Sequence, residues 1–224
     1  MLLVLFTGNL LMEPRVDQME ASLSWPIALL INLVLLVLFG LQHSIMARQS
    51  FKQWIIQWVP EKLERMVYGV VSSLVLIIVV LCWQAIPIVI WDVKVEWARI
   101  ALYTLFFLGW LLNLAASNLI DGPQLLGLTQ LKAYFLGAKI KEDIFKTPIL
   151  YKMVRHPLYL GLLIAFWAAP LMTLSHLLFS VGMTIYIFIG IHYEEKDLVK
   201  RFGERYLRYQ KETPKLFPRR SILN

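Results

Sequence analysis

Long apolar runs are the feature that most restricts what this chain can fold into. A run of about 20 apolar residues matches the hydrocarbon core of a bilayer. The sequence contains three such runs, at 24–47, 66–86 and 97–120, and a longer one at 158–192. The chain is also 58% apolar and only 17% charged, whereas soluble domains are about 45–50% apolar and 25% charged. We therefore expect an integral membrane protein.

The longest apolar run carries turn-forming residues near its middle. Pro170, Thr173 and Ser175 lie in the sequence APLMTLSH, and Thr and Ser are common helix caps. We therefore expect two antiparallel helices here, each of about 17 residues, which is the lower limit for a span. The predicted fold class is all-α: an integral membrane bundle of about five transmembrane helices, the last two forming a helical hairpin.

Two terminal segments flank the predicted transmembrane bundle at 24–192. The N-terminal segment, 1–23, begins with MLLVLFTGNLLM, which is apolar but too short to span a bilayer. It is expected either to lie in the membrane interface or to precede the natural start of the chain. The C-terminal segment, 193–224, is predicted to hold a cytoplasmic amphipathic helix and a tail. Its apolar stripe has spacings of 4, 4 and 3 residues and consists of Leu198, Phe202, Tyr206 and Tyr209.

Lys and Arg are unevenly distributed over the segments that alternate across the membrane. One set of alternate segments carries 3 of these residues and the other carries 19. Because positive loops stay in the cytoplasm, we expect an inner-membrane protein with its N-terminus outside and its C-terminus in the cytoplasm. The net charge of +7 is explained by this topology and by contact with the lipid bilayer, so no nucleic-acid partner is expected.

Cysteine and metal-ligand patterns point to no redox or metal chemistry. The single cysteine, Cys82, lies in an apolar run and is expected to be a packing residue. The sequence contains no CxxC or HExxH pattern, so no metal site is predicted. It also has no Gly-rich phosphate loop, which argues against a soluble Rossmann enzyme.

Ionisable residues border both predicted hairpin helices on the same side. The sequence VRHPLYLG, residues 154–161, precedes the first helix, and Glu194 and Glu195 follow the second. Because two antiparallel helices of equal length return the chain to the side that it left, His156 and Tyr159 should lie near the two glutamates. Ionisable groups at this depth are costly and are usually functional.

A structural interpretation of the same residues is also open. Arg155 can anchor the helix on the positive side of the membrane and pair with one of the glutamates. Pro157 fits the first turn of a helix, where proline is common.

Two sequence elements together resemble a known membrane superfamily. YKMVRHPLYLG (151–161) and YEEKDLVKRFGERYLRYQKETPKLFP (193–218) look like the paired RHPxYxG and Glu-Glu-x-x-Leu elements of the isoprenylcysteine carboxyl methyltransferase and phospholipid methyltransferase superfamily. GLQHSIMARQSFKQW (40–54) and VPEKLERMVYGVVSSL (59–74) resemble its methanethiol S-methyltransferase branch and the related denitrification-accessory, NnrU-like family. Residues 117–131 depart from that branch, which usually has a more polar His/Asp-containing version there.

The resemblance implies S-adenosylmethionine as the methyl donor, with S-adenosylhomocysteine as the product, bound at the cytoplasmic surface. A carboxylate suits the ammonium group of this cofactor, and an arginine or a helix N-terminus suits its carboxylate. Aromatic walls suit its adenine, and Phe217 is one candidate. The expected cofactor-binding residues are Arg155, His156, Pro157, Tyr159, Gly161, Glu194, Glu195 and Tyr206.

The acceptor implied by the closer resemblance is a small thiol, methanethiol, which would give dimethyl sulfide. Because the thiolate is the nucleophile, a base could help, and His43 in LQHSIMAR is the first catalytic candidate. Gln42 and Arg48 are candidates for contact with the thiol. Asp121 is a second catalytic candidate, although a DGP sequence is also a common turn.

Two other functions remain open at this point. One is the same chemistry on an isoprenylcysteine carboxylate or a phospholipid amine, which would need a site open sideways to the bilayer. The other is a non-catalytic, NnrU-like membrane protein.

Overall fold

The structure is a computed structural model that describes residues 1–10, 15–120, 122–125, 127–137 and 145–218. Asp121, one of the catalytic candidates, lies outside the described residues. The elements in chain order are α1 (Leu2–Thr7), α2 (Trp25–Met46), α3 (Gln49–Ile55), the 3-10 helix η1 (Glu61–Leu63), α4 (Glu64–Cys82), β1 (Val89–Asp92), α5 (Glu96–Ile120), α6 (Gly122–Leu125), α7 (Leu128–Leu136), α8 (Ile149–Met153), α9 (Pro157–Trp167), β2 (Leu171–Thr173), α10 (Leu174–Phe202) and α11 (Glu204–Glu212).

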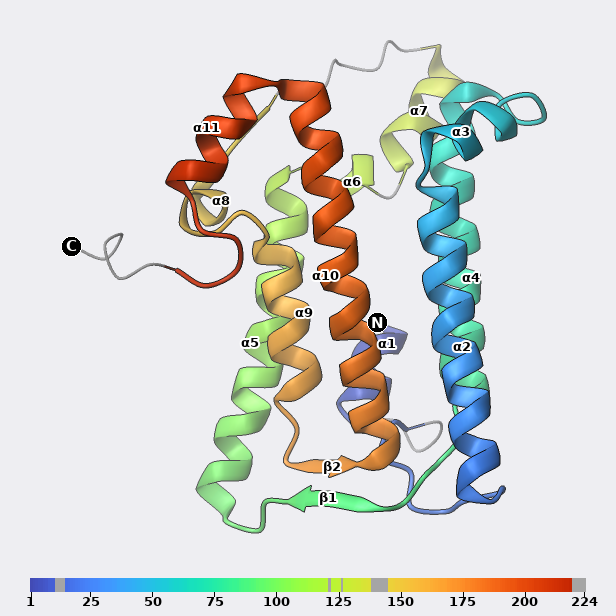
Figure 1. Ribbon diagram of the computed structural model, residues 1–224, viewed down its shortest axis with the longest axis vertical. Coiled ribbons are helices and arrows are strands. Elements are labelled where there is room, and N and C mark those ends of the chain that lie inside the picture. The colour runs from blue at the N-terminus through green and yellow to red at the C-terminus, as the bar shows by residue number, and fades with distance from the viewer. Residues whose placement is uncertain (11–14, 121, 126, 138–144, 219–224) are drawn as a thin grey trace.

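The predicted helical membrane bundle is confirmed. Within the described ranges, four helices are long and apolar enough to cross a membrane: Trp25–Met46, Glu61–Cys82, Glu96–Ile120 and Leu174–Phe202. Figure 1 shows α2 and α4 side by side at one edge of the bundle, α5 and α9 at the other edge, and α10 between the two pairs. The α11 end of the bundle also carries α3 and α7, and the opposite end is closed by the two strands.

The hairpin forms as expected, but its two helices differ greatly in length. Helix α9 has 11 residues, which gives about 16 Å at 1.5 Å per residue, so it falls short of a full span. Helix α10 has 29 residues and runs on through the polar sequence after His192, because that sequence contains good helix formers. It ends at Gly203, whose φ of 56° suits glycine. The amphipathic stripe is therefore divided between α10 and α11.

A short ribbon closes the end of the bundle opposite α11. The predicted turn between α9 and α10 contains the strand β2, which pairs antiparallel with β1. Thr173 caps α10 as predicted, since its hydroxyl accepts a hydrogen bond from the backbone N–H of His176 at 3.3 Å.

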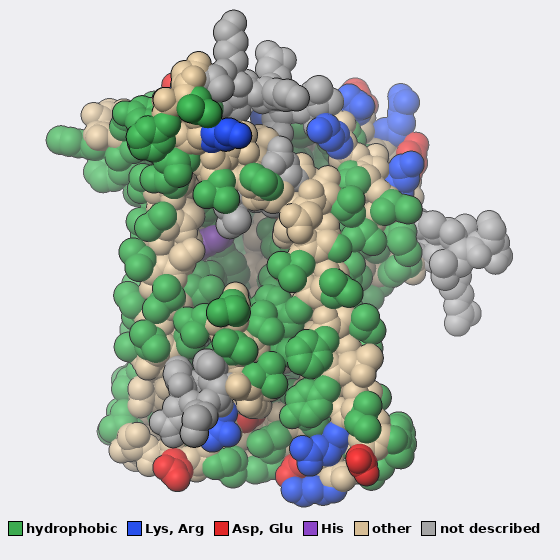
Figure 2. Space-filling model, turned by 180° about the vertical axis from the view of Figure 1, so that it is seen from behind, with side chains coloured by type: hydrophobic (Ala, Val, Ile, Leu, Met, Phe, Trp, Pro, Cys, Tyr) green, Lys and Arg blue, Asp and Glu red, His purple; other side chains and the backbone are tan. Residues whose placement is uncertain are grey.

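Apolar side chains cover the outside of the bundle as well as its interior. Leu30 of α2 and Leu111 of α5 are 63% and 60% exposed, which suits contact with lipid chains. Trp25 and Trp97 begin their helices with exposed rings, as in the aromatic belts of membrane proteins. Seen from behind, the middle of the molecule is apolar and charged side chains lie toward its two ends (Figure 2).

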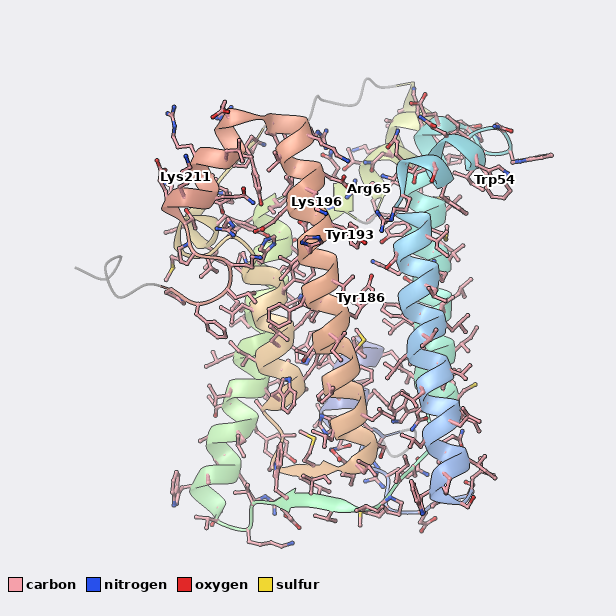
Figure 3. The ribbon with its side chains drawn as sticks, in the orientation of Figure 1. Trp54, Arg65, Tyr186, Tyr193, Lys196 and Lys211 are labelled. Atoms are coloured by element: carbon pink, nitrogen blue, oxygen red, sulfur yellow. The ribbon has the colours of Figure 1, made fainter. Side chains whose placement is uncertain are left out.

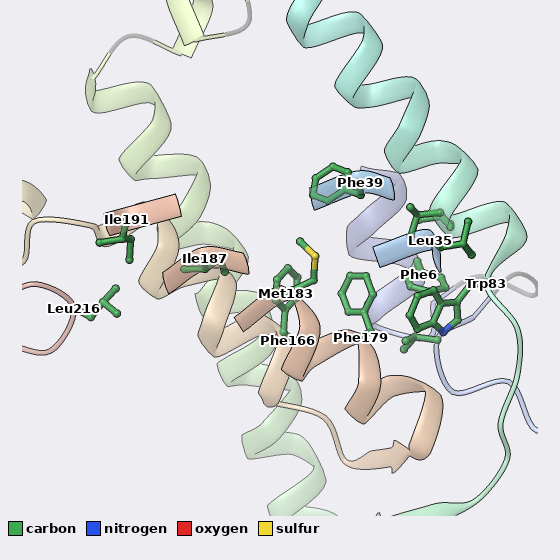
Figure 4. Close-up of a cluster of buried hydrophobic side chains, with 13 residues drawn as sticks. Phe6, Leu35, Phe39, Trp83, Phe166, Phe179, Met183, Ile187, Ile191 and Leu216 are labelled. Atoms are coloured by element: carbon green, nitrogen blue, oxygen red, sulfur yellow. The ribbon is translucent and has the colours of Figure 1, made fainter. Parts of the chain in front are cut away.

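Helix α1 of the N-terminal segment packs against the bundle interior through its buried face. Phe6 of α1 is fully buried, and its ring meets Trp83 and Phe179 edge-on at 6.3 and 5.6 Å between centroids. These rings belong to a core cluster that extends through Met183 toward the α11 end (Figure 4). Tertiary contacts thus bury a helix that is far too short to span a bilayer.

Candidate active site

A pocket of about 330 Å³ lies between α2 and α10 at the α11 end of the bundle. Figure 3 shows Tyr186 and Tyr193 on the side of α10 that faces α2. Residues 186–201 of α10 contribute to the wall, which corresponds to about 22 Å along a helix. The lining residues are His43, Ser44, Ala47, Arg48, Tyr68, Tyr159, Tyr186, Ile189, Gly190, Tyr193, Glu194, Asp197, Leu198 and Arg201.

Two sets of contacts link α2, and the residues that follow it, to α10 around the pocket. The first lies at the deep end of the pocket and the second nearer the α11 end. At the deep end, a Cβ built on Gly182 would lie 2.6 Å from Leu36, and one built on Gly40 would lie 3.5 Å from the Tyr186 ring. Nearer the α11 end, the Arg48 guanidinium lies 4.0 Å from the centroid of the Tyr193 ring, in a cation–π contact. The helices therefore touch at their middle and diverge toward the α11 end, which leaves the space that the pocket occupies.

Three tyrosines in the pocket wall connect four helices through their hydroxyl groups. Tyr68 of α4 lies 2.5 Å from Nε2 of His43 on α2. The Tyr186 hydroxyl on α10 is hydrogen-bonded to Ser44 on α2. Tyr159 of α9 donates to the carboxylate of Glu194 on α10. These bonds fix the rings and leave an aromatic wall on the deep side of the pocket.

The pocket has a charged end and an aromatic end. Arg48, Glu194, Asp197 and Arg201 lie toward the α11 end, where both α2 and α10 reach their polar turns. His43 and Tyr186 lie deeper, and the Phe39 ring packs against both at 5.4 and 5.6 Å between centroids. A ligand with a zwitterionic head and a small apolar partner would match this division.

Glu195 organises a second cluster next to the pocket. Its Oε1 accepts from Nε of Arg155 at 2.8 Å and lies 3.0 Å from Nε2 of His156, while its Oε2 lies 3.5 Å from Lys215. Arg155 also donates to the carbonyls of Gln210 and Thr213. The cluster thus ties the chain after α11 to α9 and α10, which is the ion-pair role that the sequence left open for Arg155.

Aromatic packing around α11 extends this second cluster. Tyr206 is 2% exposed, and its ring lies 5.7 Å from both Phe145 and Tyr209. Burial raises the pKa of Tyr206, and the nearby Glu195 carboxylate raises it further. Burial also raises the pKa of Tyr209 to about 12, and its hydroxyl donates to the Tyr151 carbonyl at 2.5 Å. Both phenols are therefore neutral hydrogen-bonding groups at neutral pH.

The structure divides the predicted site residues between several places. The pocket contains His43, Arg48, Tyr159 and Glu194. The second cluster contains Arg155, His156, Glu195 and Tyr206. Three predicted residues lie outside both places: Pro157 begins α9, Gly161 lies against α5, and Gln42 is bonded to Ser72 and Met46. Phe217, the predicted adenine contact, is 71% exposed and does not line the pocket between α2 and α10.

Sequence reasoning missed several pocket residues. Tyr68 and Tyr186 are single polar side chains inside apolar spans, which is the signal that could have found them. Ser44 stands next to His43 in the same sequence element. Their pairing depends on the rotation of three helices about their axes, and the sequence does not give that rotation.

The pocket residues fit S-adenosylmethionine. The carboxylates of Glu194 and Asp197 suit the ammonium of its amino-acid end, and the guanidinium of Arg48 suits its carboxylate. A Cβ built on Gly190 would meet no atom within 4 Å, so this wall of the pocket leaves room for a ligand. The aromatic side chains beside it offer stacking surfaces for a base.

The fold and the pocket define a class: an integral-membrane helical bundle with a polar ligand pocket at one end of its last hairpin. The NnrU protein family matches over residues 31–218, and the chain belongs to this family. It is 46% identical to the methanethiol S-methyltransferase of Pseudomonas deceptionensis over 94% of this chain and 80% of that protein. It is 41% identical to the methanethiol S-methyltransferase of Mycobacterium tuberculosis over 95% of this chain and 87% of that protein.

A more distant relative comes from animals. Nurim from Rattus norvegicus is 31% identical over 85% of this chain and 71% of that protein. No solved structure matches the chain.

Proposed function

We propose that this protein transfers a methyl group from S-adenosylmethionine to methanethiol and forms dimethyl sulfide. The observation that carries the proposal is the pocket between α2 and α10, with its charged end toward α11 and its aromatic end deep in the bundle. Several relatives that are 40–46% identical bear the name methanethiol S-methyltransferase. The enzyme class is thus thiol S-methyltransferase.

The residues that would hold the cofactor follow from the charge pattern. S-adenosylmethionine supplies an electrophilic methyl group on a positively charged sulfur. Glu194 and Asp197 would bind its ammonium, and Arg48 would bind its carboxylate. The Glu195 cluster would hold α9, α10 and the segment after α11 in their relative positions. Tyr159 orients the Glu194 carboxylate by its hydrogen bond.

The surroundings of the pocket suit a methyl transfer in which the positive charge of the sulfonium and the negative charge of the thiolate are dispersed in the transition state. Water stabilises a separated cation and anion better than the transition state between them, so a dry site favours the reaction. The deep wall is formed by tyrosine rings and backed by the core residues Phe39 and Ile187. The volume of about 330 Å³ is near the lower limit for ligand pockets, about 300–1,000 Å³, which favours a small acceptor over a lipid chain.

We also propose that the α11 end faces the cytoplasm. The sequence segments assigned to the side of α11 carry 19 of the 22 Lys and Arg residues, and positive segments are retained on the cytoplasmic side. The protein would then lie in the inner membrane and receive its cofactor from the cytoplasm. A fluorescent reporter fused to the C-terminus should be active only if this orientation is correct.

The test uses the purified full chain in lipid nanodiscs. With S-adenosylmethionine and methanethiol, we expect dimethyl sulfide in the headspace and an equal amount of S-adenosylhomocysteine in solution. Calorimetric titration with S-adenosylhomocysteine should show binding to the same preparation. If the protein binds this nucleoside but forms neither product, the proposed acceptor is wrong.

A further inference from the structure

His43 cannot take a proton directly from a ligand in the pocket. Its Nε2 lies 2.5 Å from the Tyr68 oxygen, so that nitrogen is already engaged. Its Nδ1 is buried and has no hydrogen-bond partner within the described part of the chain. The rings of Phe39 and Tyr186 pack around the imidazole at 5.4 and 5.9 Å between centroids. A proton that leaves the pocket toward His43 must therefore pass through the hydroxyl of Tyr68.

We propose that Tyr68 is a catalytic residue that relays the proton of the acceptor thiol to His43. The proposal rests on the proposed function, because it names the group that receives the acceptor's proton. Tyr68 and His43 both line the pocket, and the Tyr68 hydroxyl is hydrogen-bonded to Nε2 of the imidazole. The sequence indicated His43 as the base, and the structure adds the residue through which it acts.

The proton transfer balances with the groups that are present. The S–H bond of the thiol breaks and its proton moves to the Tyr68 oxygen, while the Tyr68 proton moves to Nε2 of His43. The products are a thiolate, a neutral tyrosine and an imidazolium. The thiolate then forms a bond to the methyl carbon of the sulfonium donor, whose own carbon–sulfur electron pair remains on the departing sulfur.

Physical chemistry explains why such a relay is useful here. A cysteine thiol has a pKa of about 8.5 and a simple alkanethiol is less acidic still, so the acceptor is mostly protonated near pH 7, whereas the thiolate is the nucleophile. A positioned base typically contributes about 10²- to 10⁴-fold to a rate. The imidazolium that forms stays hydrogen-bonded to the Tyr68 oxygen, and the Glu194 carboxylate lines the same pocket toward its charged end.

The other ionisable groups around Tyr68 come from three helices. Tyr186 on α10 and Tyr159 on α9 lie near its hydroxyl, and Glu64 and Arg65 lie on its own helix. Of the two tyrosines, Tyr186 is bonded to Ser44 and Tyr159 to Glu194. Among these three tyrosines, Tyr68 is the one whose hydroxyl is bonded to a histidine.

The experiment compares two acceptors of nearly equal size, ethanethiol and 2,2,2-trifluoroethanethiol, of which the second is far more acidic. With Tyr68→Phe, we expect the rate on ethanethiol to fall by about 10²-fold or more, and the rate on trifluoroethanethiol to change little. At an assay pH above its own pKa, the acidic thiol is largely ionised and needs no base. Titration with S-adenosylhomocysteine should give the same Kd as for the unaltered protein, because the hydroxyl does not hold the cofactor.

Tyr186→Phe is the matched control, since it removes a hydroxyl from the same pocket that is bonded to Ser44 and not to a base. Any loss in this variant should be the same for both thiols. Equal losses on both thiols in Tyr68→Phe would overturn the relay. If the unaltered protein methylates no thiol while it binds the nucleoside, the proposed function fails instead.

Two further measurements protect the test against a variant that does not fold. His43→Gln should show the same selective loss on ethanethiol, and adding Tyr68→Phe to it should cost little more, because both changes break one relay. In the unaltered protein, kcat/KM for ethanethiol should stay nearly constant from neutral pH up to the pKa of that thiol, because the base deprotonates the bound thiol. A kcat/KM for ethanethiol that rises about tenfold per pH unit over this range would mean that only the free thiolate reacts, and would contradict the relay without any substitution.

Discussion

Glu194 and Glu195 are consecutive residues with different surroundings. Successive positions on a helix point about 100° apart, so Glu194 faces the pocket with Tyr159 while Glu195 faces Arg155 and His156. The side chain of Glu194 is 43% exposed and that of Glu195 is 12% exposed. One carboxylate is therefore available to a ligand, and the other is already used by the protein.

This difference predicts opposite effects for two neighbouring substitutions. Glu194→Gln should weaken binding of S-adenosylhomocysteine by roughly 10- to 100-fold, since a hydrogen bond to a charged group contributes about 1.5–3 kcal/mol. Its unfolding temperature should not change. Glu195→Gln should lower the unfolding temperature, because Arg155 and Lys215 lose their common partner. Calorimetric titration and thermal unfolding of both variants would show the reverse pattern if the roles were exchanged.

At the scale of elements, α5 and α9 approach until their backbones touch. A Cβ built on Gly161 would lie 2.5 Å from the Gly109 carbonyl oxygen and 2.7 Å from the Asn113 backbone nitrogen. Small residues permit such close helix packing in membranes, where van der Waals contact drives association. Gly161 was expected to bind the cofactor, but its observed contacts are with the neighbouring helix.

The contact predicts that Gly161→Ala destabilises the bundle. The added methyl group meets backbone atoms that cannot rotate away, so we expect a loss of about 1–3 kcal/mol, as in overpacked cores. Gly190→Ala is the matched control, because its added methyl meets no atom within 4 Å. It should keep the thermal stability but weaken nucleoside binding, since Gly190 lines the pocket. Thermal unfolding and titration separate the two effects.

At the scale of the whole molecule, a buried ion pair joins Asp17 of the N-terminal segment to His176, in the first turn of α10. Asp17 Oδ2 lies 2.6 Å from Nδ1 of His176, and Nε2 of His176 lies 3.1 Å from the Phe166 carbonyl oxygen. Each ring nitrogen of His176 therefore lies within hydrogen-bond distance of an oxygen. Asn9 and Thr173 donate further hydrogen bonds to the Asp17 carboxylate.

This pair predicts that the stability of the whole bundle depends on pH. Burial alone would raise the pKa of Asp17, but the hydrogen bond and charge of His176 outweigh it and lower that pKa below its ordinary value. The carboxylate therefore stabilises the fold at neutral pH, and this contribution is lost as the pH falls through the lowered pKa, below about 4. Asp17→Asn should cost about 3–5 kcal/mol at pH 7 by leaving His176 unpaired.

Thermal unfolding at pH 7 and pH 3.5 would test this. The unaltered protein should lose more stability than Asp17→Asn between the two values, because only the unaltered protein has the carboxylate to protonate. The double variant Asp17→Asn with His176→Gln should be more stable at pH 7 than the sum of the single changes implies. Equal pH dependence in all three proteins would contradict the ion pair.

The length of the apolar runs was enough to predict most of the bundle. A run of about 20 apolar residues has one stable arrangement in a bilayer, because every backbone polar group must be bonded within the segment. The hairpin pattern likewise predicted that residues near 156 and 194 would lie together, and His156 and Glu194 approach to 4.0 Å. Both conclusions depend on local composition and on chain connectivity, which a sequence contains.

Tertiary structure alone decided where the short elements lie and which side chains meet. Helix α1 is buried by its ring contacts with α4 and α10, and β1 pairs with a strand about 80 residues away. The pairing of Tyr68 with His43, and the separation of Glu194 from Glu195, depend on how each helix is rotated about its axis. An almost uniformly apolar span encodes that rotation only weakly, so close packing between helices has to determine it.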